Sequence, residues 1–488
     1  MNPLIQFKTT PPLLITLALL CFALVQNTQA VNPPPDGGYP GANTAEGDDA
    51  LFSLTSGIAN TAVGFNALHD NTTGGFNVAI GSSALANNTT GNFNMAVGTD
   101  ALRDNNANFN MAIGFRVLFL NTTGNHLTGI GAAALRNNTT ASGNTAIGAD
   151  ALRENTTGPN NTAIGADAMR ENTTGHTNTA VGVSALQSNT EGFQNTAIGN
   201  TALFSNVTGG DNTAIGGETL YSNTMGISNT AIGFNSLYGN TTGDSNTAIG
   251  RSALSVNTTG SNNSAVGEGA LGENDSGEFN VAIGRLSLQH NETGDSNTAI
   301  GESAGRNITG SGNVCIGAGV NGFAGESNIT RIRNVYESPT TDRAVYVTAD
   351  GRIGTLSSSR RYKEEIEPMN QASERLFALK PVTFRYKKGI DPARLLSFGL
   401  IAEEVAEISP ELITRDKEGK PETVRYEAVN AMLLNEFLKE HREVQELKKQ
   451  VAVLTAGLQK VSAQLAAASP SRGGLEASNP APQVVNNP

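Results

Sequence analysis

One short sequence motif, called here the repeat phrase, recurs at a fixed spacing over more than half of the chain. The phrase is Asn-Thr-Ala-Ile/Val-Gly, and thirteen of the fifteen intervals between its glycines are 17 residues long, while two are 16. A strict period of this length is typical of a solenoid in which each repeat forms one coil. The glycines stand at positions 64, 81, 98, 114, 131, 148, 165, 182, 199, 216, 233, 250, 267, 284, 301 and 317.

Each repeat has too few apolar residues to bury a face alone. The two recurring large ones are the Ile or Val before the glycine and the Leu of a following Ala-Leu pair. We predict that Ile and Leu of successive coils stack inside a β-solenoid over residues 50–318, with backbone groups paired between coils. The Ala beside each Ile then points to the opposite face, where a small side chain lets another surface approach closely.

The polar residues of the repeat predict its corners. Glycine after the strand permits a positive φ, and segments such as 155–158, Asn-Thr-Thr-Gly, supply a second corner. Asn recurs in register at Asn195, Asn212, Asn229 and Asn246. Stacked carboxamides can satisfy one another from coil to coil, so we expect an amide ladder.

Two other interpretations of the repeat are less favourable. A disordered Asn/Thr/Gly segment does not need Ile or Val before every glycine. The Asn-Thr-Thr triplets fit N-glycosylation sequons, but glycans on every coil would obstruct packing. Corner chemistry therefore explains the triplets better.

The first 30 residues have the features of a secretory signal peptide. Lys8 precedes the apolar run Leu13–Val25, and Thr28 and Ala30 supply small residues at the two positions that define cleavage. A run of about 13 apolar residues is short of the ~20 that span a bilayer. We expect a secreted or cell-surface protein that begins near Val31 and has no membrane span after cleavage.

The segments on either side of the rod have different compositions. Residues 31–49 are rich in Pro and Gly and predict an extended linker. Residues 319–356 alternate apolar and polar side chains, as in 329–335 and 344–348, and 349–351, Ala-Asp-Gly, is typical of a hairpin turn. We therefore expect a β neck after the rod.

Residues 357–436 no longer follow the repeat and predict a small α+β domain. A helix is expected over Glu364–Leu379, a strand over Val382–Tyr386, and a short helix over Ala402–Ile408 before Ser409-Pro410. A long helix is expected from Val429.

Heptad spacing predicts a coiled coil over residues 437–468, followed by a disordered tail over 469–488. Val in the first column with Leu in the second suits dimers and trimers alike. The first column holds Phe437, Val444, Val451, Leu458 and Leu465, and the second holds Leu447, Leu454 and Val461.

Composition excludes several classes of function. A formal charge of −12 disfavours nucleic acid as a partner. Cys21 and Cys315 are the two cysteines, so no intrachain disulfide remains once the leader is removed. The histidines are scattered, and we expect neither a metal site nor a cofactor.

The junction between the two regimes holds candidate catalytic residues. Three serines, 357–359, are followed by Lys363. A serine becomes nucleophilic when a base takes its proton, and a lysine is such a base only if burial lowers its pKa from about 10.4. Ser358 and Lys363 can form such a pair, although a helix cap on Ser is the commoner use of this pattern.

Four blocks after the junction resemble the C-terminal intramolecular chaperone of phage endosialidase tailspikes and related fibres. The blocks are Ser358–Ile366, Leu379–Tyr386, Gly399–Val405 and Tyr426–Val429. The resemblance implies a domain that assists assembly of a homotrimeric β-rich fibre and then cuts itself off. It implies Ser358 as nucleophile, Lys363 as general base and the 357–358 peptide bond as the bond cut.

The resemblance has one departure and one extension. Ser359 stands where the family usually has Asp after the nucleophile. The repeat phrase itself is similar to head repeats of trimeric autotransporter adhesins, although the period differs. We therefore predict a mainly β, trimeric fibre that meets a surface glycan or host-cell ligand. The alternatives are a polysaccharide-binding or polysaccharide-degrading fibre and a structural fibre whose chaperone does not cleave.

Overall fold

The computed structural model describes residues 40–334, 345–347, 352–355, 357–416 and 418–468. The chain divides into two compact units, Met1–Ser338 and Pro339–Pro488, and each is described by itself. The predicted signal peptide, the predicted turn at 349–351 and the predicted tail lie outside the described residues.

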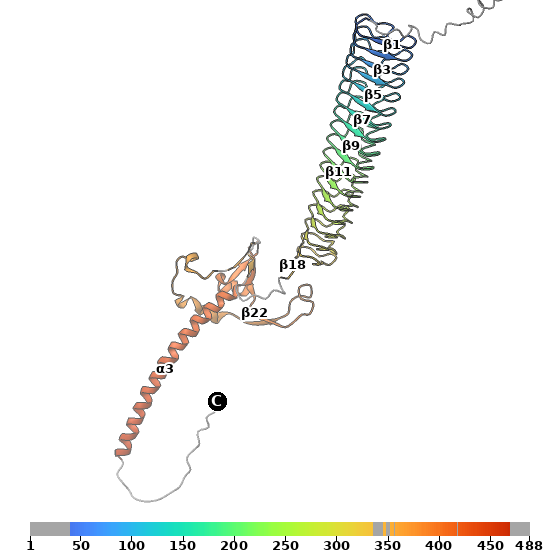
Figure 1. Ribbon diagram of the computed structural model, residues 1–488. Helices are drawn as coiled ribbons and strands as arrows, with labels where there is room; N and C mark the ends of the chain where they lie inside the picture. Colours follow the sequence, from blue (N-terminus) through green and yellow to red (C-terminus); the bar gives the residue numbers. More distant parts are fainter. Residues whose placement is uncertain (1–39, 335–344, 348–351, 356, 417, 469–488) are drawn as a thin grey trace, which may run out of the picture. The chain divides into compact units, whose positions relative to one another are not determined.

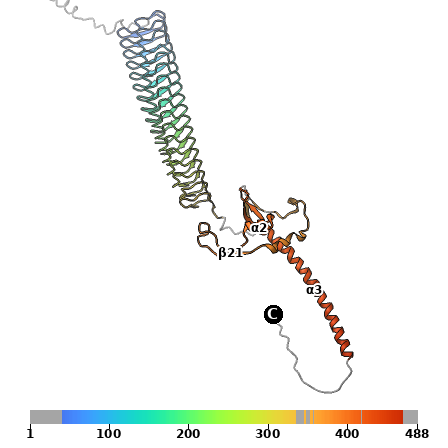
Figure 2. The same cartoon turned by 180° about the vertical axis from the view of Figure 1, so that it is seen from behind.

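The first unit is a stack of similar coils (Figures 1 and 2). Each coil contributes one short strand, and each strand pairs in parallel with the next along the chain; residues 196–198 of β10, for example, lie opposite residues 213–215 of β11. The predicted β-solenoid is confirmed. The strands within the described range are β1 (Thr44–Glu46), β2 (Thr61–Val63), β3 (Val78–Ile80), β4 (Met95–Val97), β5 (Met111–Ile113), β6 (Thr128–Ile130), β7 (Thr145–Ile147), β8 (Thr162–Ile164), β9 (Thr179–Val181), β10 (Thr196–Ile198), β11 (Thr213–Ile215), β12 (Thr230–Ile232), β13 (Thr247–Ile249), β14 (Ser264–Val266), β15 (Val281–Ile283), β16 (Thr298–Ile300), β17 (Val314–Ile316) and β18 (Thr330–Ile332).

The strand side chains face the opposite way from the prediction. Ala214 in the middle of β11 is fully buried, whereas Ile215 beside it is 37% exposed. The prediction that Ile lies inside the solenoid is wrong, while the prediction for Leu is right, since Leu220 is fully buried. A three-residue strand directs one side chain inward, and the interior of a 17-residue coil that already holds a Leu has room there for little more than Ala.

The expected amide ladder is present. Asn212 donates from Nδ2 and from its backbone N–H to Oδ1 of Asn195, both at 3.1 Å, and also from Nδ2 to the Gly226 carbonyl at 2.9 Å. The same links run on to Asn229 and Asn246. These carboxamides are buried, so the ladder satisfies polar groups that cannot reach water.

A second amide ladder, which the sequence analysis did not predict, runs through the Asn of the Asn-Thr-Thr-Gly corner. Asn172 donates from Nδ2 to Oδ1 of Asn155 at 2.7 Å and to the Gly175 carbonyl at 2.9 Å. Both asparagines are fully buried. A glycan on such a side chain does not fit inside the folded rod, which agrees with the corner interpretation of the triplets.

The glycine after each strand is required twice over. Gly165 has a φ of 138°, and a Cβ built on it would lie 2.3 Å from the carbonyl oxygen of Gly182 in the next coil. Its own N–H donates to the Ile147 carbonyl of the preceding coil at 2.8 Å. The corner therefore needs both the left-handed conformation and the absence of a side chain.

The stack is longer than the predicted range 50–318, because it begins at Thr44 and ends with β18, in the expected neck. At that end Arg331 occupies the strand position that Ala holds in most other coils, opposite the buried Cys315. Arg331 Nη1 donates to Glu326 Oε2 at 2.6 Å, and burial raises the pKa of the Cys315 thiol. An inward charged pair thus closes the apolar interior, as inward charges do at sheet edges.

The second unit is small and mixed. Three two-stranded antiparallel pairs join β19 to β20, β21 to β22 and β23 to β24 within the described residues. The first of these flanks the predicted hairpin turn. The elements are β19 (Tyr346–Val347), β20 (Ile353–Gly354), the 3₁₀ helices η1 (Arg360–Tyr362) and η2 (Asn370–Ala378), β21 (Val382–Phe384), β22 (Ser397–Gly399), α2 (Ala402–Ile408), the 3₁₀ helix η3 (Pro410–Leu412), β23 (Ile413–Arg415), β24 (Pro421–Val424) and α3 (Tyr426–Ala468).

The expected elements of this unit are partly confirmed. The helix Ala402–Ile408 has the predicted bounds, and the long helix starts at Tyr426, three residues before the predicted position. The helix expected over Glu364–Leu379 is shorter, since the helical part is the 3₁₀ segment Asn370–Ala378. Pro368 disfavours helical geometry in the residue before it, which explains the late start.

We predict that Gly165→Ala lowers the free energy of unfolding of the rod by at least about 1–3 kcal/mol, the usual cost of a strained backbone position. Gly217→Ala is the matched control, because Gly217 has no positive φ and a Cβ there lies 3.5 Å from the ring of Phe234. Thermal unfolding followed by circular dichroism measures both. Equal stability of the two variants would contradict the close-packed corner.

Candidate functional site

The junction residues form a single capped turn. The Ser359 hydroxyl accepts a hydrogen bond from the backbone N–H of Arg361 at 3.3 Å, as an N-cap of η1. The turn is closed by the Tyr362 N–H, which donates to the Ser359 carbonyl at 3.1 Å, and by the Lys363 N–H, which donates to the Arg360 carbonyl at 3.3 Å. The turn brings the backbone of Lys363 near the three serines.

Ser358 and Lys363, the predicted nucleophile and base, are both exposed in the single chain. Their side chains form no hydrogen bond with each other among the contacts of the described residues. The neighbouring Ser357 hydroxyl accepts from the Ser359 N–H at 3.3 Å. The isolated chain thus places the two groups on one short turn but does not join them, and their catalytic roles stay a prediction.

A small apolar core holds the domain that follows the turn. It is made where α2, the hairpin of β23 and β24, and the first turns of α3 meet. The buried side chains are Val405, Leu412, Ile413, Val424, Val429 and Met432.

Tyr426 at the start of α3 ties the helix to β22. Its hydroxyl accepts a hydrogen bond from the Leu400 N–H at 3.0 Å. A Cβ on Gly399 would lie 2.7 Å from the same hydroxyl, so only glycine leaves room for the ring. Two of the sequence blocks that carry the resemblance, 399–405 and 426–429, therefore meet through this contact.

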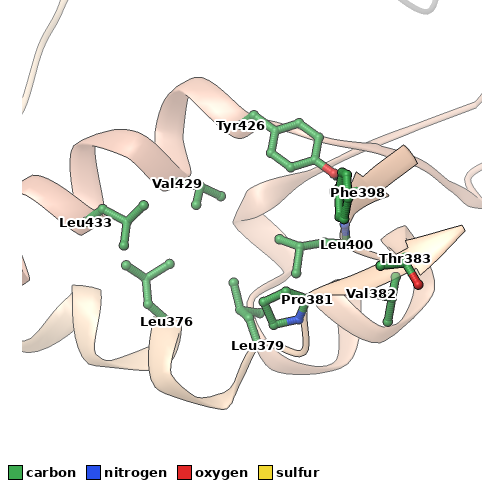
Figure 3. Close-up of a pocket in the computed structure, with 11 residues that line it drawn as sticks. Leu376, Leu379, Pro381, Val382, Thr383, Phe398, Leu400, Tyr426, Val429 and Leu433 are labelled. Carbon is green, nitrogen blue, oxygen red and sulfur yellow. Dashed lines mark hydrogen bonds between the residues drawn. The ribbon is translucent and has the colours of Figure 1, made fainter. Parts of the chain in front are cut away.

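An open groove of about 480 Å³ lies beside this contact (Figure 3). Its walls come from η2, from the β21–β22 hairpin and from the first turns of α3, and its lining is mostly apolar. The lining side chains shown in Figure 3 include Leu376, Leu379, Phe398, Val429 and Leu433. No charged residue lines the groove, so we assign it no chemistry of its own.

A polar network that the sequence analysis missed fastens η2 to α3. Ser373 is fully buried; its hydroxyl donates to Glu436 Oε1 and accepts from Asn435 Nδ2 at 2.6 Å. Lys439 Nζ donates to the same Glu436 oxygen at 2.7 Å and to Glu374 at 3.3 Å. The hydrogen bonds from Lys439 and Ser373 lower the pKa of the Glu436 carboxyl. The signal in the sequence that could have revealed this network is Glu436, a charged residue on the face of α3 that packs against the domain.

The remainder of α3 carries exposed apolar columns. Val451 is 60%, Leu454 66% and Leu458 68% exposed. The helix is also long and apolar enough, by length and composition only, to cross a membrane, and none of its most apolar stretch is buried in the single chain. Exposure of both heptad columns is what an unpartnered coiled-coil helix shows.

No group of three or more His, Cys, Asp or Glu side chains able to hold a metal ion occurs in the part of the chain that the structure describes. Three of the histidines expected to be isolated instead take part in ring stacks along the rod. His69 stacks on Phe52 and His126 on Phe109, each with ring centroids little more than 5 Å apart, and His176 stacks on Phe193 at 5.7 Å.

Comparison with known proteins bears on the junction and the domain after it. Residues 358–414 match the family described as the chaperone of endosialidase, a family of peptidases. The match starts at the predicted nucleophile and ends in β23. No curated protein and no solved structure matches the chain. The rod is therefore described from its own geometry, and the similarity to the chaperone of endosialidase concerns residues 358–414.

We predict that Glu436→Gln reduces the stability of the C-terminal unit at neutral pH and that this difference vanishes in acid. Because the folded carboxyl has a lowered pKa, its stabilising effect is present above the unfolded value near 4.5 and is lost as the pH falls through the folded value. Helix content against temperature at several pH values measures this effect. Glu440→Gln, an exposed position on the same helix, is the control, and a pH-independent difference would contradict the network.

Proposed function

We propose that this chain is an exported fibre protein whose C-terminal region brings copies of the chain together and then detaches itself by cutting the Ser357–Ser358 bond. The observation that carries the proposal is the chaperone-of-endosialidase match at 358–414, directly downstream of the eighteen-strand rod in the same chain. Such a pairing of rod and chaperone is what a self-assembling fibre requires.

Exposed apolar surface on the C-terminal helix supports self-association. The two heptad columns of α3 are half-exposed or more for most of their length, and Leu447 is 51% exposed. A helix with such a seam is stabilised when a second helix with the same seam covers it. Another copy of this chain is the partner that supplies one.

The rod offers a matching surface. From β2 to β17 the first and third strand positions hold Thr, Ser, Val, Met or Ile and no charged residue, although the protein carries a net charge of −12. The third position forms a column of partly exposed Ile and Val side chains along the stack. Its spacing of ~4.8 Å per coil is matched best by another rod with the same repeat. The number of copies, three, comes from the family resemblance.

The proposed cut is an acyl shift followed by hydrolysis. The Ser358 hydroxyl oxygen attacks the Ser357 carbonyl carbon while the neutral amine of Lys363 takes the hydroxyl proton. The Ser357–Ser358 amide bond then breaks, and Lys363 returns the proton to the departing nitrogen. Water hydrolyses the resulting ester, which leaves a carboxylate on Ser357 and a free amine on Ser358.

Assembly supplies the condition for this step. Lys363 is exposed in the single chain. Burial against neighbouring copies favours the neutral amine, because desolvation disfavours the charged form. Cutting therefore follows assembly and does not precede it.

We predict that the fragment 358–488 appears only in oligomeric material, and that Ser358→Ala and Lys363→Ala abolish it without preventing assembly. Size exclusion followed by intact mass measurement separates the two readouts. Ser357→Ala is the control that keeps the proposed nucleophile. Cutting that persists in Ser358→Ala would assign the nucleophile to another residue or to an outside protease.

We predict that Leu447→Ser combined with Leu454→Ser leaves monomers or aggregates, because it removes two of the three apolar residues of the second heptad column. The control is Val453→Ser, since Val453 is 72% exposed and lies on neither column. Light scattering reports the mass of the particles. Wild-type oligomers from the double variant would show that α3 does not direct assembly.

A further inference from the structure

Near its N-terminal end the rod carries a ladder of aromatic rings at one corner. Phe76, Phe93, Phe109 and His126 occupy the position two residues before each strand, and the rings stack face to face with centroids 4.9, 5.1 and 5.3 Å apart. The three phenylalanines are each about half exposed. They form a ridge that runs parallel to the stack.

The strands beside this ridge differ from those of most other coils in their first residue. After each of the three phenylalanines the next strand starts with Val78, Met95 or Met111, where most coils have Thr. Ridge and strands together enclose an open groove of about 420 Å³ with no charged lining residue, here called the aromatic groove. It is lined by Phe76, Val78, Phe93, Asn94, Met95, Phe109, Asn110, Met111, Leu127 and Thr128.

The repeat does not require this groove. At the same corner most later coils have polar residues such as Gln194, Asp211 and Ser228, with Phe279 as the one aromatic residue before the strands β7 to β18, and the rod continues unchanged. A contact that runs the whole length of the rod would call for the same residues in every coil. The aromatic groove therefore points to a local partner.

The chain enters the rod at this very corner. The Phe76 N–H donates to the Ile58 carbonyl at 2.9 Å, and one coil earlier the Ala59 N–H donates to the Gly41 carbonyl at 2.8 Å in the same way. Ala42, with a φ of 62°, occupies the position that Phe76 holds two coils later. The described part of the rod thus begins, at residue 40, two residues before the corner that carries the aromatic ridge two coils later.

We propose that the proline-rich segment 32–39, Asn-Pro-Pro-Pro-Asp-Gly-Gly-Tyr, folds back and docks in the aromatic groove of its own chain. Proline-rich segments in the polyproline II conformation bind aromatic-lined grooves with little loss of chain entropy. The adjacent glycines 37 and 38 permit the necessary reversal. The proposal does not depend on self-cleavage or on assembly.

Length and spacing both suit this occupant. Four coil spacings separate Ala42 from Phe109, which is ~19 Å at ~4.8 Å per coil. Residues 37–39 span up to ~10 Å when extended, which is about two coil spacings, and residues 32–36 add ~15 Å as polyproline II helix, so the segment reaches the groove. One polyproline turn rises ~9.3 Å, close to two coil spacings, so successive turns of the segment meet equivalent rings.

The test uses the absence of tryptophan from the chain. Asp36→Trp places one fluorophore in the segment of the full chain. We expect blue-shifted emission, weak quenching by acrylamide, and no dependence on protein concentration. Adding Phe93→Ser and Phe109→Ser should shift the emission to that of a solvated tryptophan, whereas Phe234→Ser, an equally exposed ring outside the groove, should not.

A second measurement avoids the added tryptophan. Replacing prolines 33–35 by Ser should raise the binding of a hydrophobic dye severalfold, and the rise should disappear when Phe93→Ser and Phe109→Ser are combined with it. Circular dichroism checks that each rod is folded. A solvated tryptophan with the groove intact, or a blue shift that appears only as concentration rises, would overturn the proposal; the latter would assign the groove to a second copy.

Discussion

The rod depends on hydrogen bonds that each coil can make only with its neighbours. The buried carboxamides of Asn155 and Asn195 are satisfied by asparagines one coil away, and the short strands have no partners within their own coil. Each coil also holds non-glycine residues at positive φ, such as Leu152 at 51°, which costs roughly 1–2 kcal/mol per residue. A single coil is therefore unstable alone, and stability comes from stacking.

The interior of the rod is narrow because each coil is short and stacks closely on the next. This narrow interior determines which strand side chains lie on the surface. Buried Leu side chains and the two Asn ladders occupy most of the interior. The inward position of each strand therefore has room only for Ala, and the neighbouring Ile lies on the outside. The rod thus stacks well but keeps an apolar, uncharged strip along its length. At its C-terminal end the pair of Arg331 and Glu326 closes the interior, which disfavours end-to-end stacking of another rod there.

Structural features that recur in every repeat could be predicted from the sequence, whereas features that depend on tertiary contacts could not. The repeat period, the corner glycines and the ladder through Asn195 could be predicted from the spacing of the residues. The helix α2 could be predicted as a short helix because Ser-Pro follows it. The facing of Ile215 was wrong, because alternation tells that Ala and Ile face apart but not which one the interior has room for. The Ser373–Glu436 contact joins residues 63 positions apart, and no local sequence pattern predicts such a contact. The pairing of Ser358 with Lys363 stays a prediction, since both are exposed in one chain.

Native mass spectrometry of the purified wild-type protein shows whether the chain assembles and cuts itself. We expect a complex of several equal rods that each end at Ser357, together with a separate fragment that begins at Ser358. The same complex should be recovered uncut from Lys363→Ala. Wild-type chains found only as uncut single copies would contradict both the assembly and the cleavage that we propose for the C-terminal region.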